Sequence, residues 1–176
     1  MSSTFTGPIR IFKRNNPTNN GVIAPDNTGA ASCSQQVSFS GVNAAGAITT
    51  YGIGSQSTTA DSIVLPAGAL ISNVRLFETT APSAFTGMVI TVAIGATTIG
   101  TITPLTTGGI ISYVPATTTA AAALLANVGV NDVTLTFTVG TTSGVTGTLA
   151  GIFDVSYVAR NIDGSIIPYG SGYTNN

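Results

Sequence analysis

Few side chains in this sequence are suited to proton transfer or nucleophilic catalysis. The chain contains no histidine and a single cysteine, so a Ser-His-Asp triad and a histidine-based metal site are excluded. The carboxylates are spread along the chain, and none has an i, i+3 or i, i+4 neighbour: Asp26, Asp61, Glu78, Asp132, Asp154 and Asp163. A facing pair of the glycosidase kind is therefore disfavoured. We expect no enzymatic activity, no metal and no cofactor.

The remaining ionisable groups suggest structural roles. Cys33 has no second cysteine to pair with, and we expect it to be a small, buried or semi-buried apolar residue. Arg75 and Glu78 are expected to form a local surface pair. Asp132 and Asp163 are expected at turns.

Basic residues gather near the N-terminus. Three of the five basic residues fall within one segment that also carries apolar side chains: Ile9, Arg10, Ile11, Phe12, Lys13 and Arg14. Three interpretations remain open, namely an anchor that docks on an acidic protein surface, a solvated loop, and a nucleic-acid arm. Three charges support only a few phosphate contacts and the chain has a net charge of -1, so nucleic acid is disfavoured as a partner.

The elements that would position these groups are mostly strands. Residues 133–139 alternate apolar and threonine side chains, which is typical of a half-buried strand. Residues 88–94 and 97–102 are predicted to form a hairpin across Gly95-Ala96, and 149–158 a last long strand. Residues 62–65, 70–77 and 110–114 are further short strands. The threonines before Ala120 offer N-cap hydroxyls, which predicts one short helix within 117–127.

The chain ends differ from this middle part. Residues 1–60 are interrupted repeatedly by Gly, Pro and Asn, which predicts an extended N-terminal arm, and residues 161–176 form a C-terminal tail. The resulting fold class is all-β: an antiparallel, jelly-roll-like β-sandwich over residues 61–160 with one short helix. No apolar stretch approaches the ~20 residues that cross a bilayer, so we expect no membrane partner.

Only 6% of the residues are charged, against ~25% in an average soluble domain. The polar positions are filled largely by threonine hydroxyls, which another protein covers at a lower desolvation cost than ions. This composition favours a subunit of an assembly.

One segment resembles a known family. The run Asp61-Ser-Ile-Val-Leu-Pro-Ala-Gly-Ala-Leu-Ile-Ser-Asn-Val-Arg75, together with strands 88–94 and 155–158, resembles the head decoration (cement) proteins of tailed bacteriophages. The resemblance covers roughly residues 61–160 and leaves the arm unmatched.

The resemblance implies a virion structural protein on the outer capsid surface, made in the host cytoplasm. It further implies the major capsid protein as partner, a homotrimer, and an N-terminal arm that grips capsomers. The capsid-contact residues expected on this basis are Phe5, Ile9, Arg10, Ile11, Phe12, Lys13 and Arg14.

Two other functions stay open. In a tail-fibre or adhesin module the sandwich loops and tyrosines would bind a carbohydrate, although packing is the favoured role for these tyrosines: Tyr51, Tyr113, Tyr157, Tyr169 and Tyr173. In a small jelly-roll coat protein the basic segment 9–14 would bind the nucleic acid of the viral genome.

Overall fold

The computed structural model describes residues 31–53, 60–140 and 142–160. The strands are β1 (Ala31–Val42), β2 (Gly46–Ala47), β3 (Tyr51–Gly52), β4 (Val64–Leu65), β5 (Leu70–Thr80), β6 (Ala84–Thr86), β7 (Ile90–Ile94), β8 (Thr97–Ile102), β9 (Ile110–Ser112), β10 (Val114–Pro115), β11 (Val133–Val139), β12 (Ser143–Thr146) and β13 (Leu149–Ala159). Helix α1 (Thr119–Ala126) is the one helix in these ranges.

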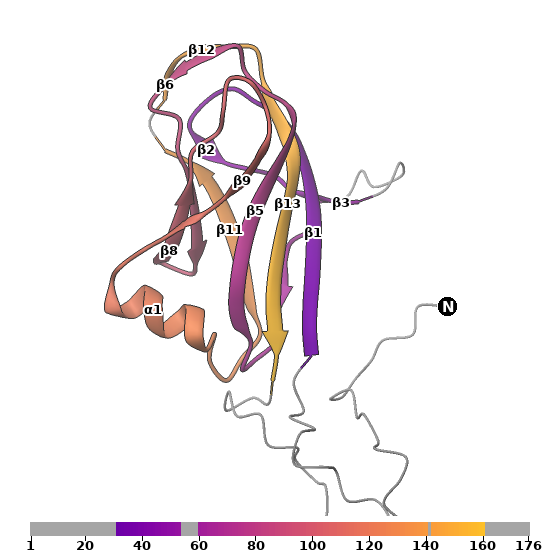
Figure 1. Cartoon of the computed structure of the whole chain (residues 1–176), viewed down its shortest axis with the longest axis vertical. Coiled ribbons are helices and arrows are strands. Elements are labelled where there is room, and N and C mark those ends of the chain that lie inside the picture. Colours follow the sequence, from indigo (N-terminus) through magenta and orange to yellow (C-terminus); the bar gives the residue numbers. More distant parts are fainter. Residues whose placement is uncertain (1–30, 54–59, 141, 161–176) are drawn as a thin grey trace, which may run out of the picture.

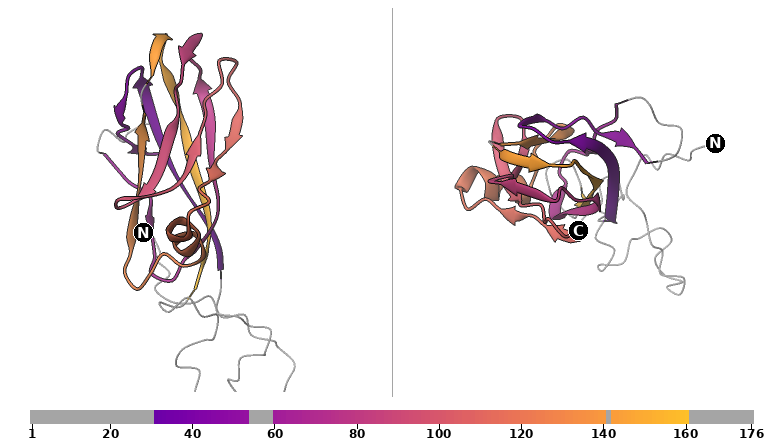
Figure 2. Two further views of the ribbon diagram at one scale, coloured as in Figure 1. Left: turned by 90° about the vertical axis from the view of Figure 1, so that its left-hand side faces the viewer. Right: turned by 90° about the horizontal axis from the view of Figure 1, so that it is seen from above.

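The strands form two main antiparallel sheets (Figures 1 and 2). The five-stranded sheet has the order β3-β1-β13-β5-β9. The six-stranded sheet has the order β10-β8-β7-β11-β2, with β4 also paired to β11, while β6 and β12 form a separate ribbon. The predicted antiparallel β-sandwich with one short helix is thus confirmed, and the finer expectation of a jelly roll stays a prediction.

Local patterns explain the best-predicted elements. Strand β11 buries Leu135, Phe137 and Val139 and exposes the threonines between them, as its alternation predicts. Strands β7 and β8 form the expected hairpin. The turn between them needs Gly95, whose φ of 55° lies in the left-handed region that other residues avoid.

An aromatic stack joins the two sheets through the core. The Phe153 ring on β13 stacks on Phe39 of β1, with centroids 4.6 Å apart, and on Phe137 of β11, with centroids 3.8 Å apart. Because β11 belongs to the other sheet, the Phe137–Phe153 contact crosses the sandwich. Phe153 is fully buried, so this stack lies inside the single hydrophobic core cluster.

Helix α1 begins and ends through identifiable contacts. The Thr118 hydroxyl accepts a hydrogen bond from the Ala121 N–H at 3.2 Å, which caps the first turn as predicted. At the other end the Arg160 guanidinium donates to the carbonyl of Ala126 and, at 3.0 Å, to that of Gly68. Arg160 therefore ties the end of β13 to the last turn of α1, where a cation is favoured.

The predicted boundary between arm and sandwich is wrong. Strand β1 pairs with β13 from Ala31 to Val42, and β2 and β3 lie in the two sheets. The sandwich thus includes residues 31–53, which belong to the predicted arm 1–60. Residues 1–30 and the tail 161–176 lie outside the described residues.

The error has a physical cause. Strand β1 places only Val37 and Phe39 as buried apolar side chains on the core face, and the polar Gln35 shares that face. The opposite face carries serines and Gln36, which are typical of loops in composition. Long-range pairing with β13 overrides that local preference.

One edge segment serves both sheets. Strand β9 pairs with β5 in the first sheet, and β10, one residue later, pairs with β8 in the second. The Tyr113 N–H between them donates to the Val74 carbonyl at 2.8 Å. At Gly100 of β8 an added Cβ would collide with the Tyr113 ring, so the crossing requires glycine there.

The two ends of the described sandwich are neighbours. Ala31, the first residue of β1, is paired with Ala159, the last residue of β13. Figure 1 shows both strand ends at the same pole of the sandwich, near α1. Residues 1–30 and 161–176 therefore join the sandwich at adjacent positions.

Two truncations test the revised boundary. Removal of residues 2–30 should leave the melting temperature nearly unchanged, because no described strand is lost. Removal of residues 2–60 deletes β1 and the core side chains Val37 and Phe39, each worth about 1.5–3 kcal/mol when buried. We expect this second protein to lose its cooperative thermal unfolding transition, as followed by circular dichroism.

The shorter truncation is the control for handling and expression. Cooperative unfolding of the 2–60 deletion at the melting temperature of the full chain would show that β1 is not part of the folding unit.

Candidate functional site

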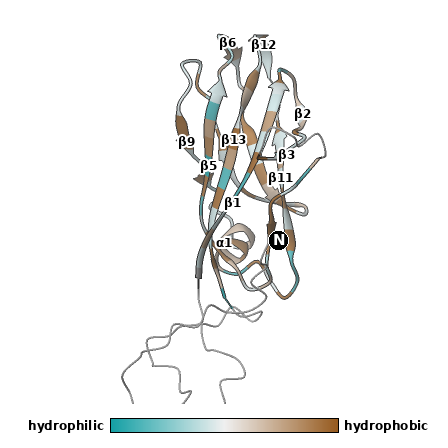
Figure 3. Ribbon diagram, turned by 90° about the vertical axis from the view of Figure 1, so that its right-hand side faces the viewer, coloured by the Kyte–Doolittle hydropathy of each residue, from teal (hydrophilic) through white to brown (hydrophobic). Residues whose placement is uncertain are grey.

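A polar cluster lies on the outer face of the five-stranded sheet. Its centre is Asp154, on the middle strand β13. In the sheet register Asp154 is directly opposite Gln36 on β1 and Arg75 on β5. Directly opposite side chains share one face of a sheet, so three strands bring these groups together. Figure 3 shows hydrophilic segments on these strands, between the hydrophobic ones.

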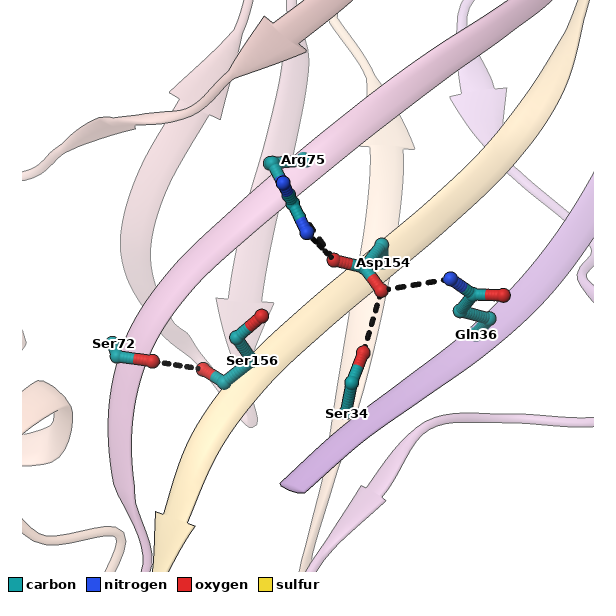
Figure 4. Close-up of polar contacts among 6 residues, drawn as sticks. All are labelled: Ser34, Gln36, Ser72, Arg75, Asp154 and Ser156. Carbon is teal, nitrogen blue, oxygen red and sulfur yellow. Dashed lines mark hydrogen bonds and ion pairs between the residues drawn. The ribbon is translucent and has the colours of Figure 1, made fainter. Parts of the chain in front are cut away.

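The carboxylate of Asp154 is fully engaged (Figure 4). Oδ1 accepts hydrogen bonds from the Ser34 hydroxyl at 2.5 Å and from Gln36 Nε2 at 2.9 Å. Oδ2 accepts two from Arg75, from Nη2 at 2.7 Å and from Nε at 3.1 Å. Within the described part of the chain this Arg75–Asp154 contact is the one ion pair.

The cluster keeps Asp154 ionised although it is shielded from water. The Asp154 side chain is only 2% exposed, whereas that of Arg75 is 39% exposed. Burial by itself raises the pKa of Asp154, but the hydrogen bonds from Ser34, Gln36 and Arg75 and the positive charge of Arg75 outweigh burial and hold that pKa below its ordinary value. Arg75 also lies over the Phe77 ring, 5.3 Å from its centroid.

This arrangement is suited to holding strands together. Every oxygen of Asp154 already accepts hydrogen bonds, and its lowered pKa makes it a poor proton carrier near neutral pH. Sequence reasoning missed the cluster because it joins residues up to 120 positions apart. A single acidic residue inside the apolar strand 152–155 was the available signal.

The expected pair between Arg75 and Glu78 is not formed. Residues three apart on a strand point to opposite faces, and Arg75 pairs with Asp154 instead. Oε1 of Glu78 accepts the Leu105 N–H at 2.9 Å, while Oε2 is buried and has no hydrogen-bond partner among the described residues. Burial raises the pKa of Glu78, and the Leu105 hydrogen bond offsets part of that effect.

The two remaining described carboxylates, Asp61 and Asp132, accept hydrogen bonds from backbone N–H groups. Asp61 accepts the Ser62 N–H, and Asp132 accepts the Ala67 N–H at 2.9 Å, across two neighbouring loops. The described ranges hold no group of three or more Cys, Asp or Glu side chains able to bind a metal ion. Asp26 and Asp163 lie outside these ranges.

The predicted contact residues also fall outside the described part of the chain. These are Phe5, Ile9, Arg10, Ile11, Phe12, Lys13 and Arg14. The expectation for Cys33 agrees with its position, since it is half-buried and packs against the core.

The described tyrosines do not gather into a platform. Tyr157 is buried in the core and accepts a hydrogen bond from Gln35 Nε2 at 2.9 Å. Tyr113 packs at the crossing of β9 and β10, whereas Tyr51 lies on β3, at the opposite edge of the five-stranded sheet. Tyr169 and Tyr173 lie outside the described residues.

One shallow hollow lies beside the loop between β1 and β3. It has a volume of about 300 Å³, and its lining includes Ser40, Asn43, Thr49 and Tyr51. Ligand pockets in proteins begin at about this volume, but they are mostly apolar and enclosed. The hollow therefore lacks the features of a small-molecule active site.

Comparison with known proteins gives no relative. No protein-family model matches the chain, and neither a curated protein nor a solved structure matches it. Among the described residues no helix has the length and apolar character needed to span a membrane.

The Asp154 cluster predicts a specific acid response. A carboxylate whose pKa is lowered by folding stabilises the protein above its unfolded-state pKa, about 3.9, and this stabilisation is lost as the pH falls through the lower folded-state value. Arg75→Met should reduce the free energy of unfolding at pH 7 by about 2 kcal/mol, because it removes charge-assisted hydrogen bonds. This loss should shrink as the pH falls through the folded-state pKa of Asp154, because the protonated carboxyl group no longer pairs with Arg75.

The matched control is Arg160→Met, which removes a guanidinium bonded to two carbonyls and to no carboxylate. It should lower the free energy of unfolding by an amount that stays the same from neutral to acid pH. A loss of stability in Arg75→Met that is the same at every pH would rule out the assigned electrostatic role. Urea unfolding across a pH series measures both losses.

Proposed function

We propose that the protein is a virion structural protein, a capsid decoration or cement protein that binds the outer shell and bridges capsomers. The observation that carries the proposal is the resemblance of residues 61–75 to head decoration proteins of tailed phages. In the fold these residues form β4, the following turn and the first half of β5.

The position of the chain ends supports this proposal. Residues 1–30 and 161–176 join the sandwich at one pole, because Ala31 and Ala159 are paired. A terminal segment that grips a shell would hold this pole against it and leave the opposite pole outward. The basic and apolar segment 9–14 belongs to the N-terminal one of these two segments.

Composition and side-chain placement give further support. The most buried charged group, the Asp154 carboxylate, accepts hydrogen bonds from neighbouring strands. Asp61 and Asp132 accept hydrogen bonds from backbone N–H groups in loops. A surface built from hydroxyls and small apolar side chains is covered by a neighbour at a modest desolvation cost.

The mechanism of stabilisation is mass action. A protein that binds the assembled shell and not its separated subunits shifts the equilibrium toward the shell. At a free concentration of 100 times the dissociation constant this gain is about 2.7 kcal/mol per site. The proposed contacts are Phe5 and residues 9–14, with the major capsid protein as partner and a homotrimer as the bound form.

Shells that lack the protein provide the direct test. Deletion of residues 2–16 should lower the number of copies bound per particle at least tenfold, as counted by mass spectrometry of intact particles. The triple variants Arg10→Gln/Lys13→Gln/Arg14→Gln and Ile9→Ser/Ile11→Ser/Phe12→Ser separate the charged from the apolar contribution.

The matched control is Asn15→Ser/Asn16→Ser/Asn19→Ser, which alters the same segment without changing its charge or apolar content. It should bind like the wild type. Full occupancy by the 2–16 deletion would overturn the anchor role, and no binding of the wild type to any shell would overturn the proposed function.

A carbohydrate-binding module is the second candidate. The hollow lined by Asn43, Thr49 and Tyr51 is the observation that favours it, because amide, hydroxyl and aromatic groups suit a sugar. A specific signal on a glycan array that Asn43→Ala abolishes, without any binding to shells, would select this candidate.

A further inference from the structure

Glu78 connects strand β5 to the loop 103–109, which leads from β8 in one sheet to β9 in the other. The backbone N–H of Glu78 donates to the Gly109 carbonyl at 2.9 Å. The side-chain Oε1 of the same residue accepts the Leu105 N–H at 2.9 Å. One residue therefore holds both the middle and the end of the loop, at the pole of the sandwich opposite α1 (Figure 1).

The loop itself has few apolar contacts with the sandwich. Pro104 is buried, but Leu105, Thr106 and Thr107 after it are exposed. The Leu105 side chain is 44% exposed and lies against its own loop, since a Cβ added at Gly109 would be 3.4 Å from Leu105 Cδ1. A segment with so little buried apolar surface opens easily, so the hydrogen bonds of Glu78 contribute much of what holds it closed.

The Glu78 carboxyl group is only half satisfied in this position. Oε2 is the one buried side-chain oxygen or nitrogen atom that has no hydrogen-bond partner in the described part of the chain. An ionised carboxylate loses much more hydration energy there than a neutral carboxyl group does. Burial accordingly raises the pKa of Glu78, and the hydrogen bond from Leu105 offsets only part of this effect.

No charge on the surrounding elements could take the place of a proton on Glu78. The described parts of 79–131 and 133–153 contain no Asp, Glu, Lys or Arg, and they include the loop, β9, the β6–β12 ribbon and the part of β13 beside Glu78. Tyr113 is titratable, but burial raises its pKa and keeps it neutral. Arg75 lies on the other face of β5 and pairs with Asp154.

The remaining described charges bond elsewhere. They are Asp61, Asp132 and Arg160, whose hydrogen bonds join backbone groups of other loops and of α1.

We propose that Glu78 is a proton-dependent latch: its neutral carboxyl group holds the loop 103–109 against β5, and its ionised carboxylate turns to solvent and releases the loop. In the neutral form Oε2 carries the proton, while Oε1 still accepts the Leu105 N–H. Glu78 is only partly buried, so its side chain reaches water by rotation. This inference does not depend on the proposed virion role.

The direction of the pH effect follows from linkage. In the released loop the Glu78 carboxyl group is solvated, and its pKa is about 4.3, as in a free side chain. In the closed loop the pKa is higher. The closed state therefore gains stability at acid pH, and this gain is lost as the pH rises through the closed-state pKa. Asp154, whose pKa is lowered, has the opposite effect on the whole fold.

Hydrogen exchange of the Leu105 amide tests the latch in the unaltered chain. The protection factor, which is the intrinsic exchange rate divided by the observed rate, reports opening of the loop. It should fall at least about threefold between about pH 4 and about pH 8. The control is the Ser83 N–H, which donates to the Thr146 carbonyl at 2.9 Å, without a carboxylate. Its protection factor should stay constant.

A pair of variants assigns the effect to Glu78. Glu78→Gln keeps the Oε1 acceptor and is neutral at every pH, so its Leu105 protection factor should not change across the same pH series. The matched control is Asp132→Asn, which alters another carboxylate that accepts a loop N–H, that of Ala67. This protein should keep the pH dependence of the wild type at Leu105.

Two results contradict the latch. One is a Leu105 protection factor that is constant or rises with pH in the wild type, a measurement that needs no variant to fold. The other is a fall with pH that persists in Glu78→Gln.

Discussion

Strand β13 has a buried inner face and, on its half-buried outer face, one buried residue, Asp154, and the rest of the sandwich depends on how both faces are satisfied. Its inner face places Phe153 between Phe39 and Phe137, which links the two sheets through stacked rings. Its outer face places Asp154 under Ser34, Gln36 and Arg75. One strand thus combines an apolar contact across the sandwich with a polar contact along the sheet.

The polar side of this arrangement favours one alignment of strands. An apolar strand tolerates a change of register if it shifts by two residues, because the same face stays buried. The Asp154 carboxylate does not tolerate such a shift, since it would move away from Gln36 and Arg75 and remain buried without partners. The cluster is therefore a device for specificity, and an ion pair with 39% exposure on one side adds only moderately to stability.

Sequence patterns predicted the local elements well and the long-range ones poorly. Interactions between residues close together in the sequence determine three correctly predicted features. These are the alternation in β11, the β7–β8 hairpin around Gly95 and the Thr118 cap of α1. The serines and glutamines of β1 are typical of loops, so the sequence predicts an arm there. The pairing of β1 with β13, which the local sequence does not show, makes this segment a strand. The Asp154 cluster could not be predicted for the same reason, since its members meet only after the strands align.

The placement of β13 also constrains when the fold can form. The strand is the last of the described strands along the chain, yet it lies between β1 and β5 in the middle of its sheet. The contact between Ser34 and Asp154 spans 120 residues, so a long loop must close before the sheet is complete. During synthesis β1 consequently leaves the ribosome long before its partner exists. Folding of this sheet is therefore expected to be slow for a domain of its size.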